Sequence, residues 1–177
     1  MDPSEHEIFR AAIRGDRDAF EMIIRTQSRA LFAIAYGILQ NRSDAEDAVQ
    51  DAFIKAWKGR WKLRDAEKFP VWLATIVRHR ARDLARKRKP EPLPDELADQ
   101  PEELVPLEDS LGKHLQVALA ELPELHRAAL TLRYFEELDY AAIERLLGLS
   151  NGALRGILGR ALQTLRERLR AALTTLE

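Results

Sequence analysis

The sequence predicts an all-α protein built from two small helical domains joined by an acidic, proline-rich linker. Gly and Pro number only eight each among 177 residues, and 46% of the residues are apolar. Apolar side chains recur at helical spacing between helix-capping residues. Residues 90–110, in contrast, hold five of the eight prolines and no long apolar period. We therefore expect a first domain over residues 1–90, a linker over 91–110 and a second domain over 111–177.

The first domain is expected to contain four helices. Two capping-box patterns, Ser4 with Glu7 and Ser43 with Glu46, mark the beginnings of the first and third. Asp16 can cap the second, and Pro70 suits the first position of the fourth, which Pro90 ends. The predicted spans are residues 4–15, 16–39 with a break near 26–28, 44–58 and 70–89.

The second domain is expected to end in a helix-turn-helix. Pro123 begins a helix that runs to about residue 135. Asp139 can cap a short helix over residues 140–147. Gly148 ends that helix and Ser150 caps the next, which runs beyond residue 170. Two helices joined by a three-residue turn with Gly fit the helix-turn-helix pattern, although ordinary helical pairs share it.

Charge is distributed unevenly along the chain. The formal net charge is only −1, yet residues 1–90 carry 19 basic and 13 acidic side chains, and residues 91–110 carry eight acidic and no basic ones. A basic first half indicates a polyanion partner. The absence of cysteine excludes disulfides and thiol catalysis. The longest apolar run, residues 30–39, is too short to span a bilayer, and the polar start is no secretion signal, so we expect a cytoplasmic protein.

The fourth predicted helix is amphipathic, with a face of one charge sign. Leu73, Ile76, Val77 and Leu84 share its apolar side, and Arg80 falls there too, where its head group should be paired or snorkel. A solvated face normally mixes charge signs, whereas a stripe of one sign usually has a phosphate partner. That stripe comprises Arg78, Arg82, Arg86 and Lys89, with Thr75 and His79 beside it.

Aromatic residues precede this stripe. All three tryptophans, Trp57, Trp61 and Trp72, fall within sixteen residues. Aromatic rings beside a cationic groove can stack on unpaired bases, or they can simply pack in the core. Core packing is favoured for Trp57 and Phe69. For Trp61 and Trp72 the sequence does not decide between packing in the core and stacking on bases. Trp61 is flanked by basic residues of the same loop: Arg60, Lys62 and Arg64.

The third predicted helix begins with acidic residues. The helix dipole favours Asp44, Glu46 and Asp47 in the first turns, but it does not explain Asp51. An acidic patch beside a cationic nucleic-acid helix indicates a basic protein partner.

Three stretches together, "DAEDAVQDAFIKAW", "FPVWLATIVRHRARDLARKRK" and "LPELHRAALTLRYFEELDYAAIERLLGLSNGAL", resemble the bacterial sigma factors of the extracytoplasmic-function class. The resemblance covers nearly the whole chain. It implies two helical domains, region 2 and region 4, that bind core RNA polymerase and direct it to promoter DNA. It also implies an anti-sigma factor as a further partner, and a linker whose acids imitate RNA along the exit path.

The resemblance assigns residues to three interfaces. The polymerase interface comprises Asp44, Glu46, Asp47, Gln50 and Asp51. The part that melts and reads the −10 element comprises Arg60, Trp61, Lys62, Arg64, Trp72, Thr75, Arg78, His79, Arg82, Arg86 and Lys89. The −35 element would meet Ser150, Asn151, Gly152, Arg155, Gly156 and Arg160.

The chain departs from the family in two places. His79 stands where family members usually carry Asn. In the last helix, Ile157 and Leu162 replace expected basic residues, and Gly156 and Gly159 lie inside the helix, where each glycine costs about 0.8–1 kcal/mol relative to Ala. We therefore expect a weakened −35 contact, and Ile157 is available for a protein contact instead.

Two functions are compatible with these patterns. The first is a working sigma factor. The second is a sigma-like decoy that binds an anti-sigma factor or polymerase with little reading of −35 DNA. An enzyme is a third possibility that the residues do not favour, because the four histidines have no ligand spacing among themselves. No cofactor, metal, small-molecule substrate or membrane insertion is expected.

Overall fold

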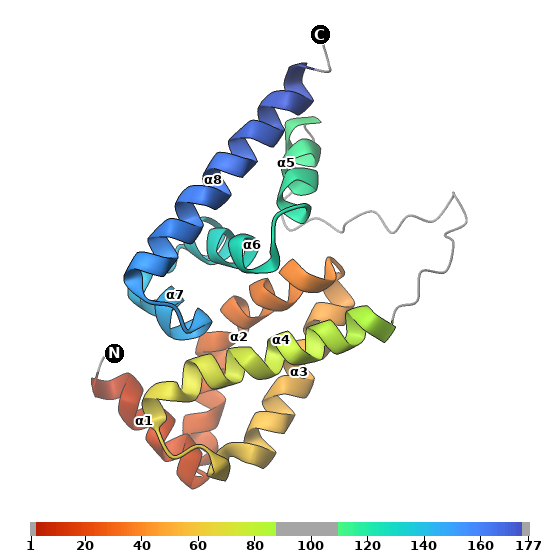
Figure 1. Cartoon of the computed structure of the whole chain (residues 1–177). Helices are drawn as coiled ribbons and strands as arrows, with labels where there is room; N and C mark the ends of the chain where they lie inside the picture. The colour runs from red at the N-terminus through yellow and green to blue at the C-terminus, as the bar shows by residue number, and fades with distance from the viewer. Residues whose placement is uncertain (1–2, 88–109, 175–177) are drawn as a thin grey trace.

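The computed structural model of the chain describes residues 3–87 and 110–174, and every regular element in these ranges is a helix, which confirms the all-α prediction. The predicted linker and the boundaries of both domains lie largely outside them. We call helices α1–α4 the N-terminal unit and α5–α8 the C-terminal unit (Figure 1). The elements are α1 Pro3–Arg14, α2 Arg17–Leu39, α3 Arg42–Gly59, η1 Arg60–Lys62, η2 Ala66–Lys68, α4 Phe69–Lys87, α5 Ser110–Ala120, α6 Glu124–Leu130, η3 Thr131–Phe135, α7 Tyr140–Leu147 and α8 Asn151–Thr174.

Most predicted helix ends are confirmed by their capping geometry. The Asp16 carboxylate accepts a hydrogen bond from the Ala19 amide at 3.0 Å, and Asp139 accepts one from Ala142 at 2.7 Å. Gly148 adopts the left-handed conformation, with φ of 68°, that ends α7. The three-residue turn and α8 then follow as the helix-turn-helix pattern predicts.

Both capping-box predictions are wrong in position. α1 begins at Pro3, so Ser4 lies inside the helix. α3 is capped by Asn41, whose Oδ1 accepts the Asp44 amide at 2.9 Å, so Ser43 is already helical. Asparagine caps as well as serine does, and an earlier cap lengthens the helix that packs on α2.

Two further predicted boundaries are corrected. α2 has no break near residues 26–28, because the hydroxyls of Thr26 and Ser28 donate to carbonyls of the preceding turn without opening the helix. The helix predicted over residues 123–135 is regular only to Leu130 and continues as a π-helical turn. α4 begins one residue before Pro70.

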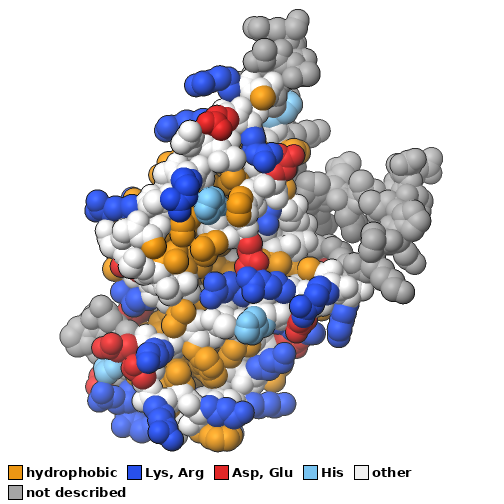
Figure 2. All heavy atoms as spheres, in the orientation of Figure 1, with side chains coloured by type: hydrophobic (Ala, Val, Ile, Leu, Met, Phe, Trp, Pro, Cys, Tyr) orange, Lys and Arg blue, Asp and Glu red, His pale blue; other side chains and the backbone are white. Residues whose placement is uncertain are grey.

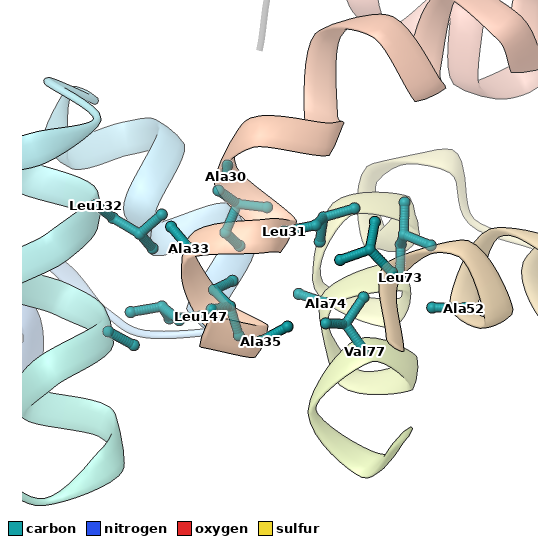
Figure 3. Packing of buried hydrophobic residues seen from close by; sticks show 14 of the residues in the cluster. Ala30, Leu31, Ala33, Ala35, Ala52, Leu73, Ala74, Val77, Leu132 and Leu147 are labelled. Atoms are coloured by element: carbon teal, nitrogen blue, oxygen red, sulfur yellow. The ribbon is translucent and has the colours of Figure 1, made fainter. Parts of the chain in front are cut away.

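α2 is buried on two faces, and this burial joins the two units in one core. On one side, Leu31 faces Leu73 and Val77 of α4 (Figure 3). On the other side, Ala30 and Ala33 face Leu132 and Leu147 of the C-terminal unit, as Figure 3 also shows. A helix covered on both sides needs apolar residues all round. The uninterrupted apolar run at 30–39 is thus explained by the packing of both units on α2.

The contact between the units also includes three ion pairs. Gly37 of α2 lies next to Arg127 of α6, and a Cβ built on it would meet the Arg127 side chain at 3.8 Å, an ordinary contact distance. The ion pairs that link the units are Arg82–Glu124, Arg145–Glu5 and Arg29–Glu136.

Among the helices of residues 3–87 and 110–174, none combines the length and apolar character required to cross a bilayer.

The shared core predicts that the two units unfold together. Replacing the fully buried Leu132 by Ala should lower the free energy of unfolding by about 2–5 kcal/mol. All three tryptophans lie in the N-terminal unit, so their fluorescence during urea unfolding reports whether a change in the C-terminal unit is felt there. The exposed Val117→Ala serves as control and should change stability by less than about 0.5 kcal/mol. A tryptophan transition that Leu132→Ala leaves unmoved would contradict the single core.

Candidate functional site

The predicted cationic stripe lies along one face of α4. Thr75, Arg78 and Arg82 follow Val71 at helical spacing, while Leu73 on the opposite side is buried. The Thr75 hydroxyl donates to the Val71 carbonyl at 2.7 Å and accepts from Arg78 Nη2 at 3.2 Å. The helix therefore holds these polar groups in one line.

The members of the stripe differ in their surroundings. Arg82 donates two hydrogen bonds of 2.9 Å to the Glu124 carboxylate of α6, and this hydrogen bonding raises the pKa of Arg82. Arg78 is half-buried beside the same carboxylate, and its burial lowers its pKa. Arg86 is exposed and pairs with Asp83 of its own helix. Lys89 lies outside the described residues. Figure 2 shows basic side chains gathered along the boundary between the two units.

Arg60, predicted to face DNA, is folded against the protein. Its Nη1 donates to the Trp57 carbonyl at 2.6 Å, and its guanidinium lies 4.0 Å from the centre of the Trp57 ring. Gly15 of the α1–α2 turn makes room for it, because a Cβ there would lie 3.0 Å from Arg60 Nη2. Lys62 and Arg64 of the same loop are exposed.

The structure separates the tryptophans into packed and exposed rings. Trp57 lies edge-on to Phe20, and Trp72 lies edge-on to the buried Phe69 with ring centres 5.6 Å apart. The core interpretation of Trp57 and Phe69 is therefore confirmed, and Trp72 is largely packed as well. Trp61, in contrast, is 69% exposed, and its indole N–H donates to the Lys58 carbonyl at 3.0 Å.

The acidic face of α3 includes one residue with a structural role. Arg80 Nε donates to Asp51 Oδ2 at 2.6 Å, and Nη2 lies equally close. This ion pair confirms that the Arg80 head group is paired, and it explains the position of Asp51 that the helix dipole left unexplained. Asp47 and Gln50 are exposed, as is Glu46, which pairs with Arg42, and Asp44 is half-buried.

Ile54, which the sequence reasoning missed, continues the exposed face of α3. Its side chain is 53% exposed one turn beyond Asp51. The signal was available: Ile54 falls seven residues after Asp47, on the face away from the buried Phe53. An exposed aliphatic side chain next to acids is typical of a protein contact.

α7 positions the first turn of α8. Asn151 Nδ2 donates to Glu144 Oε1 at 2.6 Å, and the Arg155 guanidinium lies 5.8 Å from the centre of the Tyr140 ring. A carboxylate can only accept hydrogen bonds, so the Asn151 amide is oriented with Nδ2 toward it. The Ser150 hydroxyl accepts the Ala153 amide at 3.3 Å, as expected for a cap. No sequence pattern indicated the contribution of α7.

The rest of α8 corrects one expectation. Ile157 is only 6% exposed and belongs to the core, so it is not available for a protein contact. Leu162 is half-buried against the same core. Arg160 is exposed, and its guanidinium would lie 3.3 Å from a Cβ at Gly156. Gly152 and Gly159 border open space, since no atom lies within 4 Å of a Cβ built on either.

Residues 3–87 and 110–174 contain no group of three or more His, Cys, Asp or Glu side chains suited to a metal ion.

Comparison with known families gives two matches in the expected order. Residues 23–91 match the model of Sigma-70 region 2, and residues 113–165 match that of Sigma-70 region 4. The first match contains α3, η1 and α4, and the second contains α6, α7 and the first part of α8.

Curated relatives agree with these matches. The chain is 30% identical over 173 residues to the ECF RNA polymerase sigma factor SigW of Bacillus subtilis, covering 89% of this chain and 92% of SigW. It is 33% identical over 174 residues to the probable RNA polymerase sigma factor RfaY of Xanthomonas campestris, covering 93% of this chain but spanning only 43% of that longer relative.

A solved structure shares the arrangement of the helices. The sigma factor RpoE in complex with the anti-sigma factor NepR from Bartonella quintana superposes with a TM-score of 0.59 and 25% identity, covering 85% of this chain and 96% of RpoE. With both regions matched in order and a relative matched over nearly its full length, the chain belongs to the extracytoplasmic-function sigma factors of bacterial RNA polymerase.

Proposed function

We propose that this chain binds core RNA polymerase, directs it to promoters and opens the −10 element. The observation that carries the proposal is the exposed indole of Trp61 in a basic loop that leads into the cationic helix α4. An exposed aromatic ring can stack on an unpaired base, and a row of arginines can hold the adjacent phosphates. In this proposal, residues 1–90 act at the −10 element and residues 111–177 at the −35 element.

The exposed face of α3 would contact the polymerase. Asp47 supplies charge, Gln50 supplies hydrogen bonds and Ile54 supplies apolar area, all on the side of α3 that points away from α2. Asp51 contributes less, because its carboxylate already forms an ion pair with Arg80.

The first turn of α8 would read −35 DNA in the major groove. Helix-turn-helix proteins place the N-terminal residues of the second helix against base edges. Asn151 and Arg155 occupy these positions, already oriented by Glu144 and Tyr140. Such orientation favours a reading role over the decoy alternative, because it lowers the entropy cost of binding.

Three further statements belong to the proposal. A protein that acts with RNA polymerase works in the cytoplasm and has no enzymatic activity of its own. An anti-sigma factor is the expected regulator, since RpoE of Bartonella quintana is bound by one in its crystal. Run-off transcription with purified core polymerase and genomic promoter fragments tests the central point: a chain that yields no promoter-dependent product would refute it.

Substitutions at two acidic residues of α3 should distinguish effects on polymerase binding from effects on the stability of the fold. Asp47→Asn should weaken binding to core polymerase without changing the unfolding midpoint. Asp51→Asn should also weaken binding, and it should lower stability by up to about 1 kcal/mol because the half-exposed pair with Arg80 is lost. Pull-down and thermal unfolding measure the two effects, with Glu21→Gln on α2 as a matched loss of one exposed charge. Unchanged binding by Asp47→Asn would remove α3 from the polymerase interface.

Two tryptophans should behave oppositely. Trp61→Ala should leave the fold intact and make the free energy of promoter opening less favourable by about 1–3 kcal/mol, the usual cost of removing a ring that stacks on a base. Trp72→Ala should instead lower the unfolding midpoint, because that ring packs on Phe69. Permanganate reactivity of unpaired thymines measures opening, and circular dichroism measures stability. Full opening by the Trp61 variant would show that this ring does not stack on DNA.

Arg155 should be required at promoters that depend on a −35 element. Arg155→Ala should reduce transcription from these promoters by a factor that corresponds to about 1–3 kcal/mol of binding free energy, the value of a good base contact. Arg166→Ala, which changes an exposed arginine about three turns beyond Arg155 on α8, is the matched control and should have a smaller, sequence-independent effect. If both variants transcribe like the parent, the decoy alternative is favoured.

A further inference from the structure

Arg60, the first residue of η1, points into the protein rather than toward solvent. Its Nη1 donates to the Trp57 carbonyl at 2.6 Å, and its guanidinium lies 4.0 Å from the centre of the Trp57 ring. The same group lies against the backbone of Gly15, where an added Cβ would come within 3.0 Å of Nη2. The guanidinium therefore joins the last turn of α3 to the turn between α1 and α2, which lie side by side in Figure 1.

A guanidinium in these surroundings lowers the stability of the fold. Its Nε is buried without a hydrogen-bond partner, and within residues 3–87 and 110–174 no carboxylate forms an ion pair with it. A buried donor without an acceptor is unfavourable, and so is a charge without a counter-charge. Proteins retain such features chiefly at functional sites. The functional group next to Arg60 is Trp61, the exposed ring proposed to stack on DNA.

The geometry of η1 makes the directions of its side chains depend on one another. With about three residues per turn, residues i and i+3 of a 3₁₀-helix lie above one another, and the two between them point elsewhere. The Leu63 amide donates to the Arg60 carbonyl at 3.0 Å, and the Leu63 side chain packs against the core. Arg60 and Leu63 are thus two anchors on the inward side, so Trp61 and Lys62 fall on the outward side, where both are exposed.

The end of α3 holds Trp61 as well as Arg60. The last carbonyls of an α-helix have no partner within the helix. At this end the Trp57 carbonyl accepts from Arg60 Nη1, and the Lys58 carbonyl accepts from the Trp61 indole N–H at 3.0 Å. Lys62 adds a cation 5.3 Å from the centre of the Trp61 ring. The ring is thereby held in one orientation while 69% of the residue stays exposed.

Without the guanidinium, little would define the conformation of η1. Gly59 precedes the turn, and glycine permits many backbone conformations. A single 3₁₀ turn anchored through Leu63 could then rotate and carry Trp61 with it. A ring that moves must be ordered when a base stacks on it, and this ordering weakens binding.

We propose that Arg60 is a positioning residue for Trp61: its enclosed guanidinium does not touch DNA but fixes the turn that presents the Trp61 ring to an unpaired base. The inference rests on the proposed function, in which Trp61 stacks on DNA. It gives Arg60 a different role from the direct contact that the family resemblance implies. Lys62 and Arg64, both exposed in the same loop, are then the groups that meet phosphates.

The mobility of the Trp61 ring tests the positioning in the free chain. With ¹⁵N-labelled tryptophan, each of the three tryptophans gives one indole signal, and Trp61→Ala identifies the Trp61 signal by removing it. Arg60→Met keeps a long stem but loses the guanidinium. It should lower the ¹H–¹⁵N nuclear Overhauser effect of Trp61 and leave that of the packed Trp72 at the parent value. Equal losses at both rings, or no loss at Trp61, would overturn the proposal.

A double substitution tests whether Arg60 acts through Trp61. The probe is a fork of duplex with a single-stranded overhang, bound by the chain in complex with core polymerase. Arg60→Met should weaken binding roughly three- to tenfold, a part of what one stacked ring contributes. In a Trp61→Ala background the same change should have no effect, because the ring through which it acts is gone. Equal losses in the two backgrounds would refute the positioning role.

The salt dependence of fork binding distinguishes positioning from a direct phosphate contact. Arg64→Met makes the same chemical change at an exposed arginine of the same loop and is the matched control. It should reduce the slope of log affinity against log salt concentration by about 0.7–0.9, the value of one phosphate contact. Arg60→Met should leave the slope unchanged. An equal reduction by both would assign Arg60 to a phosphate and contradict the proposal.

Arg60→Lys is the second variant, for the case in which Arg60→Met does not fold. Lysine keeps a positive charge at the C-terminal end of α3 but lacks the planar group that contacts both Trp57 and Gly15. It should mobilise Trp61 and weaken fork binding without changing the salt slope. Parent values for ring mobility and fork binding would show that the charge suffices, and would overturn the role of the enclosed guanidinium.

The positioning and the proposed function can fail separately. Fork binding by Trp61→Ala that equals the parent's refutes stacking, whatever the mobility of the ring in the free chain. A loss of binding in Trp61→Ala, together with unchanged ring mobility in the Arg60 variants, refutes the positioning alone.

Discussion

The burial of α2 on two faces is the constraint on which the rest of the structure depends. One face of α2 anchors α3 and α4, and the other receives α6 and η3. Alanines at 30, 33 and 35 and the glycine at 37 keep the helix thin enough for neighbours on both sides. Burial of both faces is why an apolar run of ten residues occurs in a chain without membrane-spanning character among its described helices. It also brings two matched sigma regions into one hydrophobic core.

This packing determines which functional groups are accessible in the free chain. Trp61, the outer face of α3 and the first turn of α8 are exposed, while the middle of the α4 stripe lies against the C-terminal unit. The proposed polymerase contacts, the proposed −35 contacts and the ring proposed to stack on DNA are therefore accessible together, whereas Arg82 already has a carboxylate partner in Glu124.

Much of the fold was predictable because helix signals are local. Asp16, Asp139, Gly148 and Ser150 fulfil their predicted roles since each acts on its own turn of backbone. The capping-box prediction at Ser43 was wrong because Asn41, two residues earlier, caps α3 instead. The surface assignments followed from amphipathic spacing, but the packing of Arg60 beneath Gly15 and onto Trp57 could not be predicted, because only the fold brings these residues together.

What the sequence could not show are the contacts between residues far apart in the chain. Nothing near Glu124 indicates a partner 42 residues earlier, and nothing near Asp51 indicates Arg80. These pairs depend on how α6 and α3 meet α4, which periodicity does not encode. The orientation of Asn151 by Glu144 is a similar case, although both residues belong to a recognisable helix-turn-helix.

The central claim is that the burial of α2 on two faces joins both units of the free chain in one hydrophobic core. The most direct measurement is energy transfer between dyes on cysteines introduced at the exposed positions 55 and 163, followed while the free chain is titrated with urea. The account predicts that energy transfer and tryptophan fluorescence change at the same urea concentration. Energy transfer that is lost well before the tryptophan signal changes would contradict the account.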